Sequence, residues 1–148
     1  MGNASLNILL AEDDEGDQFL FMEAVNGMEI NATIYTVNDG VQLMNHLVEQ
    51  DAPLPHLLFL DLNMPRKNGF ECLKEIRSNE KLKDIPIAIY STSASEKDID
   101  ETFNNGANIF IKKPNDFNLL KQILYKAITG IDQYIEEPSH KGTFLLKA

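Results

Sequence analysis

Short apolar runs recur along this chain, and segments with helical periodicity fill the intervals between them. The runs are Leu6–Ala11, Thr33–Val37, Leu57–Leu60, Pro86–Tyr90 and Asn108–Ile111. Runs of this length that are rich in apolar and β-branched residues predict buried strands. Because strands that alternate with helices pair in parallel, the pattern predicts an α/β fold: a doubly wound, five-stranded parallel sheet with helices on both faces.

Between the runs, apolar residues return at every third or fourth position, which predicts five helices. The residues at this spacing are Phe19, Met22 and Val25; Val41, Met44 and Val48; Phe70, Leu73 and Ile76; Ile99 and Phe103; and Phe117, Leu120, Leu124 and Ile128. Asp39 and Ser95 stand where they can cap the second and fourth helices. We expect the stripe of the last helix to face the sheet.

Composition excludes several classes of protein. The chain has 148 residues, of which 43% are hydrophobic and 24% charged, as expected for one folded domain. Its net charge of -10 would repel nucleic-acid phosphates and anionic lipids, so we expect no nucleic-acid partner and no membrane partner. It shows no basic leader and no apolar stretch near the roughly 18 residues of a membrane span. With Cys72 as its single cysteine, we expect a cytoplasmic protein.

Polar side chains follow the ends of the predicted strands. They are Glu12, Asp13 and Asp14 after the first strand, Asp61 after the third, Ser91 after the fourth and Lys113 after the fifth. In open α/β sheets, ligands bind beyond the carboxyl ends of the strands. We therefore expect carboxylates, a hydroxyl and an ammonium to meet at one edge of the sheet.

Such a cluster suits a specific chemistry. Carboxylates a few ångströms apart either have raised pKa values or bind a cation, and oxygen ligands with room for water suit Mg²⁺. Beside a metal ion, Asp61 can act as a nucleophile toward phosphorus and form an acyl phosphate. Mg²⁺, Lys113 and Ser91 can then each stabilise one oxygen of the transferred group.

From about Leu6 to Ile128, the chain resembles the receiver domains of bacterial two-component response regulators. The matching stretches are "NILLAEDD", "LFLDLNMPRKNG", "PIAIYS" and "FIKKP". The "ED" pair and the "DLNMP" loop are most similar to short stand-alone receivers, including some paired with phytochrome kinases. The resemblance implies a flavodoxin-like fold with strand order 2-1-3-4-5.

The resemblance also implies a role for each residue at the strand ends. Asp61 would accept a phosphoryl group from a sensor histidine kinase or a small phosphodonor, with Ser91 and Lys113 as its catalytic neighbours. Such a receiver catalyses its own phosphorylation and dephosphorylation but is not otherwise an enzyme. The Lys113–Pro114 bond is commonly cis in the family.

The implied metal ligands are four residues. Asp13 and Asp61 would bind Mg²⁺ directly, Asn63 would contribute its backbone carbonyl, and Glu12 would act through water. We do not expect Asp14 to be a ligand.

Two further positions concern the switch between states. The resemblance makes Ser91 and Phe110 switch residues, and phosphorylation would draw Ser91 inward and leave room for Phe110 to become buried. Phe110 lacks the phenol of a tyrosine, so it can respond only through burial. Thr92 stands where the family often has Ala or Gly, and we expect its branched side chain to crowd the phosphoryl group.

The C-terminal part of the sequence suggests which surface would transmit a signal to a partner. We expect residues 1–130 to form the receiver domain and residues 131–148 to form a helix extension and tail, with no effector domain. The expected output surface is the face of the fourth helix, fifth strand and fifth helix. Ile131, Tyr134 and Ile135 would present apolar groups there to a target protein or to a second copy in a homodimer. Alternatively, the tail covers the domain's own core.

Other functions remain as alternatives. The chain could be a phosphorelay intermediate, or a pseudo-receiver that binds partners without phosphorylation, although Asp61, Lys113 and the acidic pair argue against the latter. A flavin-mononucleotide carrier needs a hydroxyl- and glycine-rich phosphate loop where this chain is acidic. A dehalogenase-type phosphatase would carry Asp-x-Asp after its first strand, where this chain has no such motif.

Overall fold

The computed structural model describes residues 5–49, 51–136 and 141–147. Its strands are β1 (Leu6–Ala11), β2 (Ala32–Val37), β3 (Leu57–Leu60), β4 (Ile87–Ser91) and β5 (Ile109–Lys112). Its helices are α1 (Glu15–Asn26), α2 (Gly40–Val48), α3 (Gly69–Ser78), α4 (Glu96–Asn104), α5 (Phe117–Glu136) and α6 (Lys141–Phe144). None of these helices is long and apolar enough to cross a membrane.

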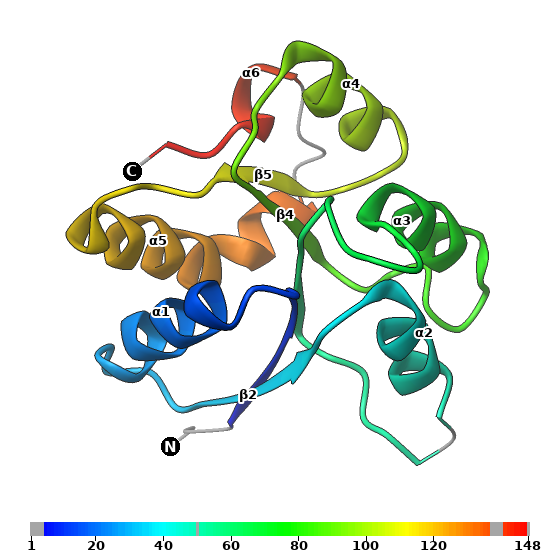
Figure 1. The fold of residues 1–148 in the computed structure, drawn as a ribbon, viewed down its shortest axis with the longest axis horizontal. Coiled ribbons are helices and arrows are strands. Elements are labelled where there is room, and N and C mark those ends of the chain that lie inside the picture. Colours follow the sequence, from blue (N-terminus) through cyan, green and yellow to red (C-terminus); the bar gives the residue numbers. More distant parts are fainter. Residues whose placement is uncertain (1–4, 50, 137–140, 148) are drawn as a thin grey trace.

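The strands form one parallel sheet in the order β2-β1-β3-β4-β5. Helices α1 and α5 lie together on one face, and α2 and α3 lie on the other, with α4 beyond them near β5 (Figure 1). The predicted fold class and strand order are therefore confirmed. The short helix α6 was not predicted; it lies in the tail, beside α4 (Figure 1).

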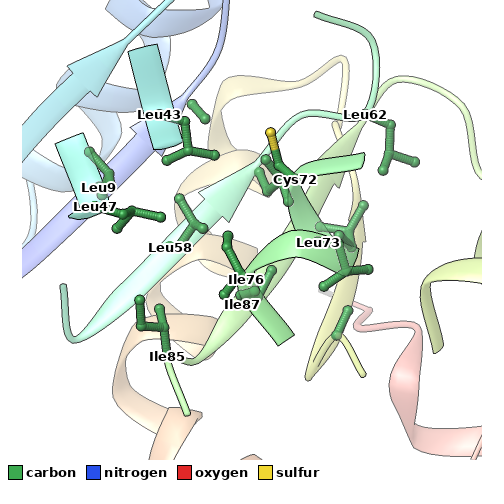
Figure 2. Packing of buried hydrophobic residues seen from close by; sticks show 14 of the residues in the cluster. Leu9, Leu43, Leu47, Leu58, Leu62, Cys72, Leu73, Ile76, Ile85 and Ile87 are labelled. Atoms are coloured by element: carbon green, nitrogen blue, oxygen red, sulfur yellow. The ribbon is translucent and has the colours of Figure 1, made fainter. Parts of the chain in front are cut away.

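Each face of the sheet packs its own hydrophobic core, because successive side chains of a strand point to opposite faces. On one side, Leu9, Leu58 and Ile87 of the strands meet residues of α2 and α3 such as Leu43 and Leu73 (Figure 2). On the other side, strand residues that include Ile8, Leu10 and Phe59 meet α1 and α5.

The sequence pattern misplaced parts of two helical faces. Phe19 and Met22 are exposed, and the buried face of α1 is formed by Phe21, Ala24 and Val25. Steps of three residues lag behind the 3.6-residue turn by about 60° each, so a stripe built from them drifts around the helix. In α2, Val41 and Val48 are exposed and the buried residues include Leu43, Met44 and Leu47.

The last helix shows a similar displacement at its two ends. Phe117, which we expected on the inner stripe, is exposed, whereas Leu120, Leu124 and Ile128 are buried as predicted. Ile131 and Tyr134 pack against the core formed with α1, so they do not form the expected exposed patch. Ile135 is exposed.

Polar side chains begin four of the helices. Asp39 and Ser95 cap α2 and α4 as predicted, and each accepts a hydrogen bond from a backbone N–H of the first turn. Asp14 caps α1 in the same way, and Asn68 begins α3 in a capping box with Glu71. These caps set where each helix starts beyond the carboxyl end of a strand.

The tail packs against β5. Phe144 is fully buried, and its ring meets Phe103 of α4 and Phe110 of β5 with centroids 5.3 and 6.1 Å away. The N–H of Leu146 donates to the carbonyl of Phe110 at 2.9 Å, and Leu145 forms a parallel bridge with Phe110. This segment of the tail therefore covers part of the domain's own core.

Candidate functional site

Backbone hydrogen bonds between neighbouring strands bring the predicted site residues to one edge of the sheet. The N–H of Asp61 donates to the carbonyl of Ala11 at 3.0 Å, directly before Glu12. The N–H of Lys113 donates to the carbonyl of Ser91 at 2.8 Å. Because these bonds belong to the parallel ladder, the side chains that follow the strands are held at fixed positions.

Three carboxylates meet there. Oxygens of Glu12, Asp13 and Asp61 all lie within 4.8 Å of one another. Glu12 is 1% exposed and Asp61 5% exposed, while Asp13 is open to solvent. The N–H of Asn63 donates to Oδ1 of Asp61 at 3.3 Å, which places the Asn63 backbone beside the cluster.

Lys113 supplies the positive charge of the cluster. Its Nζ is paired with Glu12, lies 3.0 Å from Oδ2 of Asp17 and lies 3.9 Å from Oδ2 of Asp61. Nζ also lies 5.0 Å from the centroid of the Tyr90 ring. Asp17 was not among the predicted site residues. Its signal in the sequence is its place in the first turn of a helix that follows the acidic run.

The cluster perturbs the protonation of its members. Burial raises the pKa of Glu12 from 4.5 to about 7, and the nearby charge of Asp61 acts in the same direction. Burial likewise raises the pKa of Asp61. Burial by itself would lower the pKa of Lys113, but the hydrogen bond to Glu12 and the charge of Asp61 outweigh it and raise that pKa.

Two glycines hold the loop between β3 and α3 against the site. A Cβ on Gly69 would lie 2.3 Å from the carbonyl oxygen of Asp61, so only glycine lets α3 start this close to the end of β3. A Cβ on Gly40 would lie 2.1 Å from the carbonyl oxygen of Lys67 in the same loop. Arg66, with a φ of 67°, reaches Oδ2 of the buried Asp39 at 3.3 Å. This attachment to α2 was not visible in the sequence.

The switch residues lie in the interior. Ser91 is fully buried, and its Oγ accepts a hydrogen bond from the N–H of Ser93 at 3.2 Å. Phe110 is also fully buried, beneath Phe144. In this structure the tail covers the Phe110 ring, and the expected change in its burial on phosphorylation stays a prediction. Thr92 is exposed.

Three other residues remain to be placed. The described residues contain no cis peptide bond, so the expected cis Lys113–Pro114 bond is not observed. Asp14 caps α1 and is not part of the three-carboxylate cluster. Cys72 is buried in the core between α2 and α3.

Fold and site together define a signalling receiver. Residues 8–125 match the family model of the response regulator receiver domain, and the chain belongs to this family. Members of the family receive phosphate from histidine kinases in two-component systems and are signalling phosphoacceptors rather than classical enzymes. The family prediction made from the sequence is confirmed.

Individual relatives indicate which kind of receiver domain this chain resembles. Response regulator Rcp1 of Synechocystis sp. is 34% identical over 131 residues, which cover 86% of this chain and 86% of Rcp1. The phosphorylated cyanobacterial phytochrome response regulator RcpA has a TM-score of 0.77 and 34% identity, with 93% of this chain and 98% of RcpA covered. The Mn²⁺-bound form of Rcp1 has a TM-score of 0.74 and 31% identity, with coverage of 97% and 99%. The resemblance to phytochrome-associated, stand-alone receivers is thus confirmed.

Proposed function

We propose that this chain is a cytoplasmic switch in which Asp61 accepts a phosphoryl group from a sensor histidine kinase or a small acyl-phosphate donor. One observation carries the proposal: Asp61 is a buried carboxylate with two carboxylate neighbours that could share a metal ion and with a lysine ammonium 3.9 Å away. In the transfer, a carboxylate oxygen of Asp61 forms a bond to phosphorus while the bond from phosphorus to the donor breaks. The donor leaves with that electron pair.

The donor set fits Mg²⁺. Three carboxylates with oxygens within 4.8 Å of one another carry more negative charge than Lys113 can balance, and hard oxygen ligands are the preference of this ion. Asp13 lies on the solvent side, which leaves room for the water ligands that Mg²⁺ retains. We propose Asp13 and Asp61 as direct ligands, the Asn63 carbonyl as a third and Glu12 as a ligand through water. The bound ion would neutralise charge on the carboxylate and phosphoryl oxygens.

Lys113 and Ser91 complete the proposed chemistry. The Lys113 ammonium can donate to one phosphoryl oxygen as a point charge, and its side chain is only 9% exposed, so water screens this charge weakly. The Ser91 hydroxyl can donate to another oxygen while its Oγ still accepts the hydrogen bond from the N–H of Ser93. Burial raises the pKa of Asp61, and the positive charge of Lys113 opposes this increase.

The output face that we propose is formed by α4, β5 and α5, with residues 131–148 as an extension of the receiver. Two observations support this. Phe144 of the tail covers Phe110 of β5, and the Phe144 ring also contacts Phe103 of α4. A shift of Ser91 toward a phosphoryl group would move β4, whose Ile89 is the register partner of Phe110. The response would then be a change in how the tail covers Phe110, read by a target protein or a second copy.

Intact-mass measurement tests the phosphoacceptor. With Mg²⁺ and acetyl phosphate, the wild type should gain one phosphoryl group, and a chelator or the change Asp61→Asn should prevent this. Glu15→Gln is the matched control, since it removes an exposed carboxylate from the start of α1 outside the cluster. Full labelling of Asp61→Asn would disprove the assignment.

Backbone NMR tests the output face. In Ser91→Ala, labelling should persist while the chemical-shift changes of β5, α4 and the tail disappear. Truncation after Gly130 should remove the cover from Phe110 and lower thermal stability. Shift changes that are equal in wild type and Ser91→Ala would show that the response does not pass through Ser91.

A further inference from the structure

Lys113 is held from two sides. Its Nζ lies 3.0 Å from Oδ2 of Asp17 on α1 and 3.9 Å from Oδ2 of Asp61, which directly follows β3, so the ammonium lies nearer to the helix than to the proposed phosphoacceptor. The position of Asp17 is itself set by the helix start, because its N–H donates to Oδ1 of Asp14 at 2.8 Å. This bond fixes the backbone of Asp17, and so the place from which its carboxylate reaches Lys113, on the α1 side of the site.

The partners of Lys113 differ in how readily they can release it. Glu12 is 1% exposed, so losing the lysine would leave a buried carboxylate without its counter-charge, which is costly. The Asp17 side chain is 34% exposed, so water can replace the ammonium there. When a new anion forms on Asp61, the Asp17 pair is therefore the one that breaks at the lower cost.

We propose that Asp17 is a positioning residue that holds the Lys113 ammonium on the α1 side of the site and competes with the phosphoryl group for it. The inference rests on the proposed function of Asp61. Phosphorylation then requires the Lys113–Asp17 pair to break, and this requirement weakens the phosphorylated state relative to the free one. It also links the start of α1 to the state of Asp61.

Affinity for beryllofluoride, a phosphoryl analogue, tests the proposal without turnover. In the presence of Mg²⁺, Asp17→Asn should bind the analogue roughly two- to fivefold more tightly than wild type, the range expected when one partly exposed ion pair no longer has to be broken. Asp17→Glu can still reach Lys113, so it should return the affinity toward the wild-type value. The rate of labelling by acetyl phosphate should rise in the same order.

A matched control separates this effect from a general change in charge. Glu15 lies in the same first turn of α1, is exposed and is not among the carboxylates that pair with Lys113. Glu15→Gln should therefore change the affinity by less than about twofold, as expected for a screened charge. An equal gain in Asp17→Asn and Glu15→Gln would overturn the proposal, as would unchanged or weaker binding in Asp17→Asn. A wild type that takes neither phosphoryl nor beryllofluoride would instead contradict the proposed function.

Discussion

At each end of the sheet, one cationic side chain lies among several hydrogen-bond acceptors, but the balance of charge differs between the two ends. At the amino end of β4 and β5, Arg77 of α3 donates to the carbonyls of Gly106, Lys83 and Ile85 at 2.7–2.9 Å and to the side chain of Asn108 at 3.0 Å. At the carboxyl end, Lys113 is shared between the carboxylates of Glu12, Asp17 and Asp61. The hydrogen bonds of Arg77 go to neutral carbonyl oxygens. At Lys113, by contrast, three carboxylates surround a single positive charge.

The difference indicates that the amino end of the sheet stabilises the fold and that the carboxyl end is suited to binding a cation. The planar Arg77 guanidinium meets acceptors from two loops at once, one before β4 and one before β5. Asn108 also accepts from the N–H of Ile87, so the network ties α3 to the start of two strands. Burial lowers the pKa of Arg77 but raises the pKa values of Glu12 and Asp61. The carboxyl end therefore holds negative charge that a divalent cation would relieve.

A large effect on stability is expected when the cation at the amino end, Arg77, is removed. Arg77→Ala should lower the free energy of unfolding by roughly 3 kcal/mol, because several hydrogen bonds from a charged donor are lost and part-buried carbonyls are left unpaired. Urea denaturation measures this loss. Labelling of the folded variant by acetyl phosphate should match that of wild type.

Lys74→Ala is the control for Arg77→Ala, since it removes an exposed cation from the same helix. Its effect on stability should stay within about 0.5 kcal/mol. A similar loss in both variants would mean that the charge of α3, and not the Arg77 network, stabilises this end.

An effect of similar size is expected from pH at the carboxyl end. The pKa of Glu12 is raised in the folded state, so the folded protein binds its proton more tightly than the unfolded chain does. Stability from this group is fully present below about pH 4.5 and is lost as the pH rises through about 7, by about 3 kcal/mol. Without divalent ions, denaturation of wild type should show this decline relative to Glu12→Gln. Parallel pH profiles would disprove it.

The smallest of the three effects concerns the metal ion. Binding of Mg²⁺ to the folded state alone should raise the free energy of unfolding by about 1.4 kcal/mol at ten times its dissociation constant. Thermal denaturation with and without Mg²⁺ measures this gain. Asp13→Asn should reduce the gain, while Arg77→Lys should leave it unchanged because the amino end holds no part of the cluster. An equal gain in wild type and Asp13→Asn would place the ion elsewhere.

The sequence pattern was sufficient for the sheet and for most of the acidic site. Once five apolar runs alternate with helices, the parallel pairing follows, and residues that directly follow the strands must lie at one edge. For this reason the sequence alone predicts that Glu12, Asp13, Asp61 and Lys113 lie together. The same argument puts Ser91 at the end of β4, next in the sheet to the strand that precedes Asp61.

Contacts between distant segments could not be obtained in this way. Asp17 reaches Lys113 only because of the rotational phase of α1, and the stripe that included Phe19 had that phase wrong. Likewise, the cover that Phe144 places on Phe110 depends on where the tail returns to β5. Neither local spacing nor composition specifies such a return.

By itself, then, the chain's pattern of apolar runs and strand-end carboxylates determined a receiver sheet with an acidic edge, because parallel strands carry their following residues to a common place. The tertiary structure decided how charge is shared at each end of that sheet. Arg77 contacts a loop about 30 positions away in the sequence, and Lys113 contacts carboxylates about 100 positions away. Pairs so far apart in sequence depend on how whole elements pack, and packing is settled by the complete set of buried contacts.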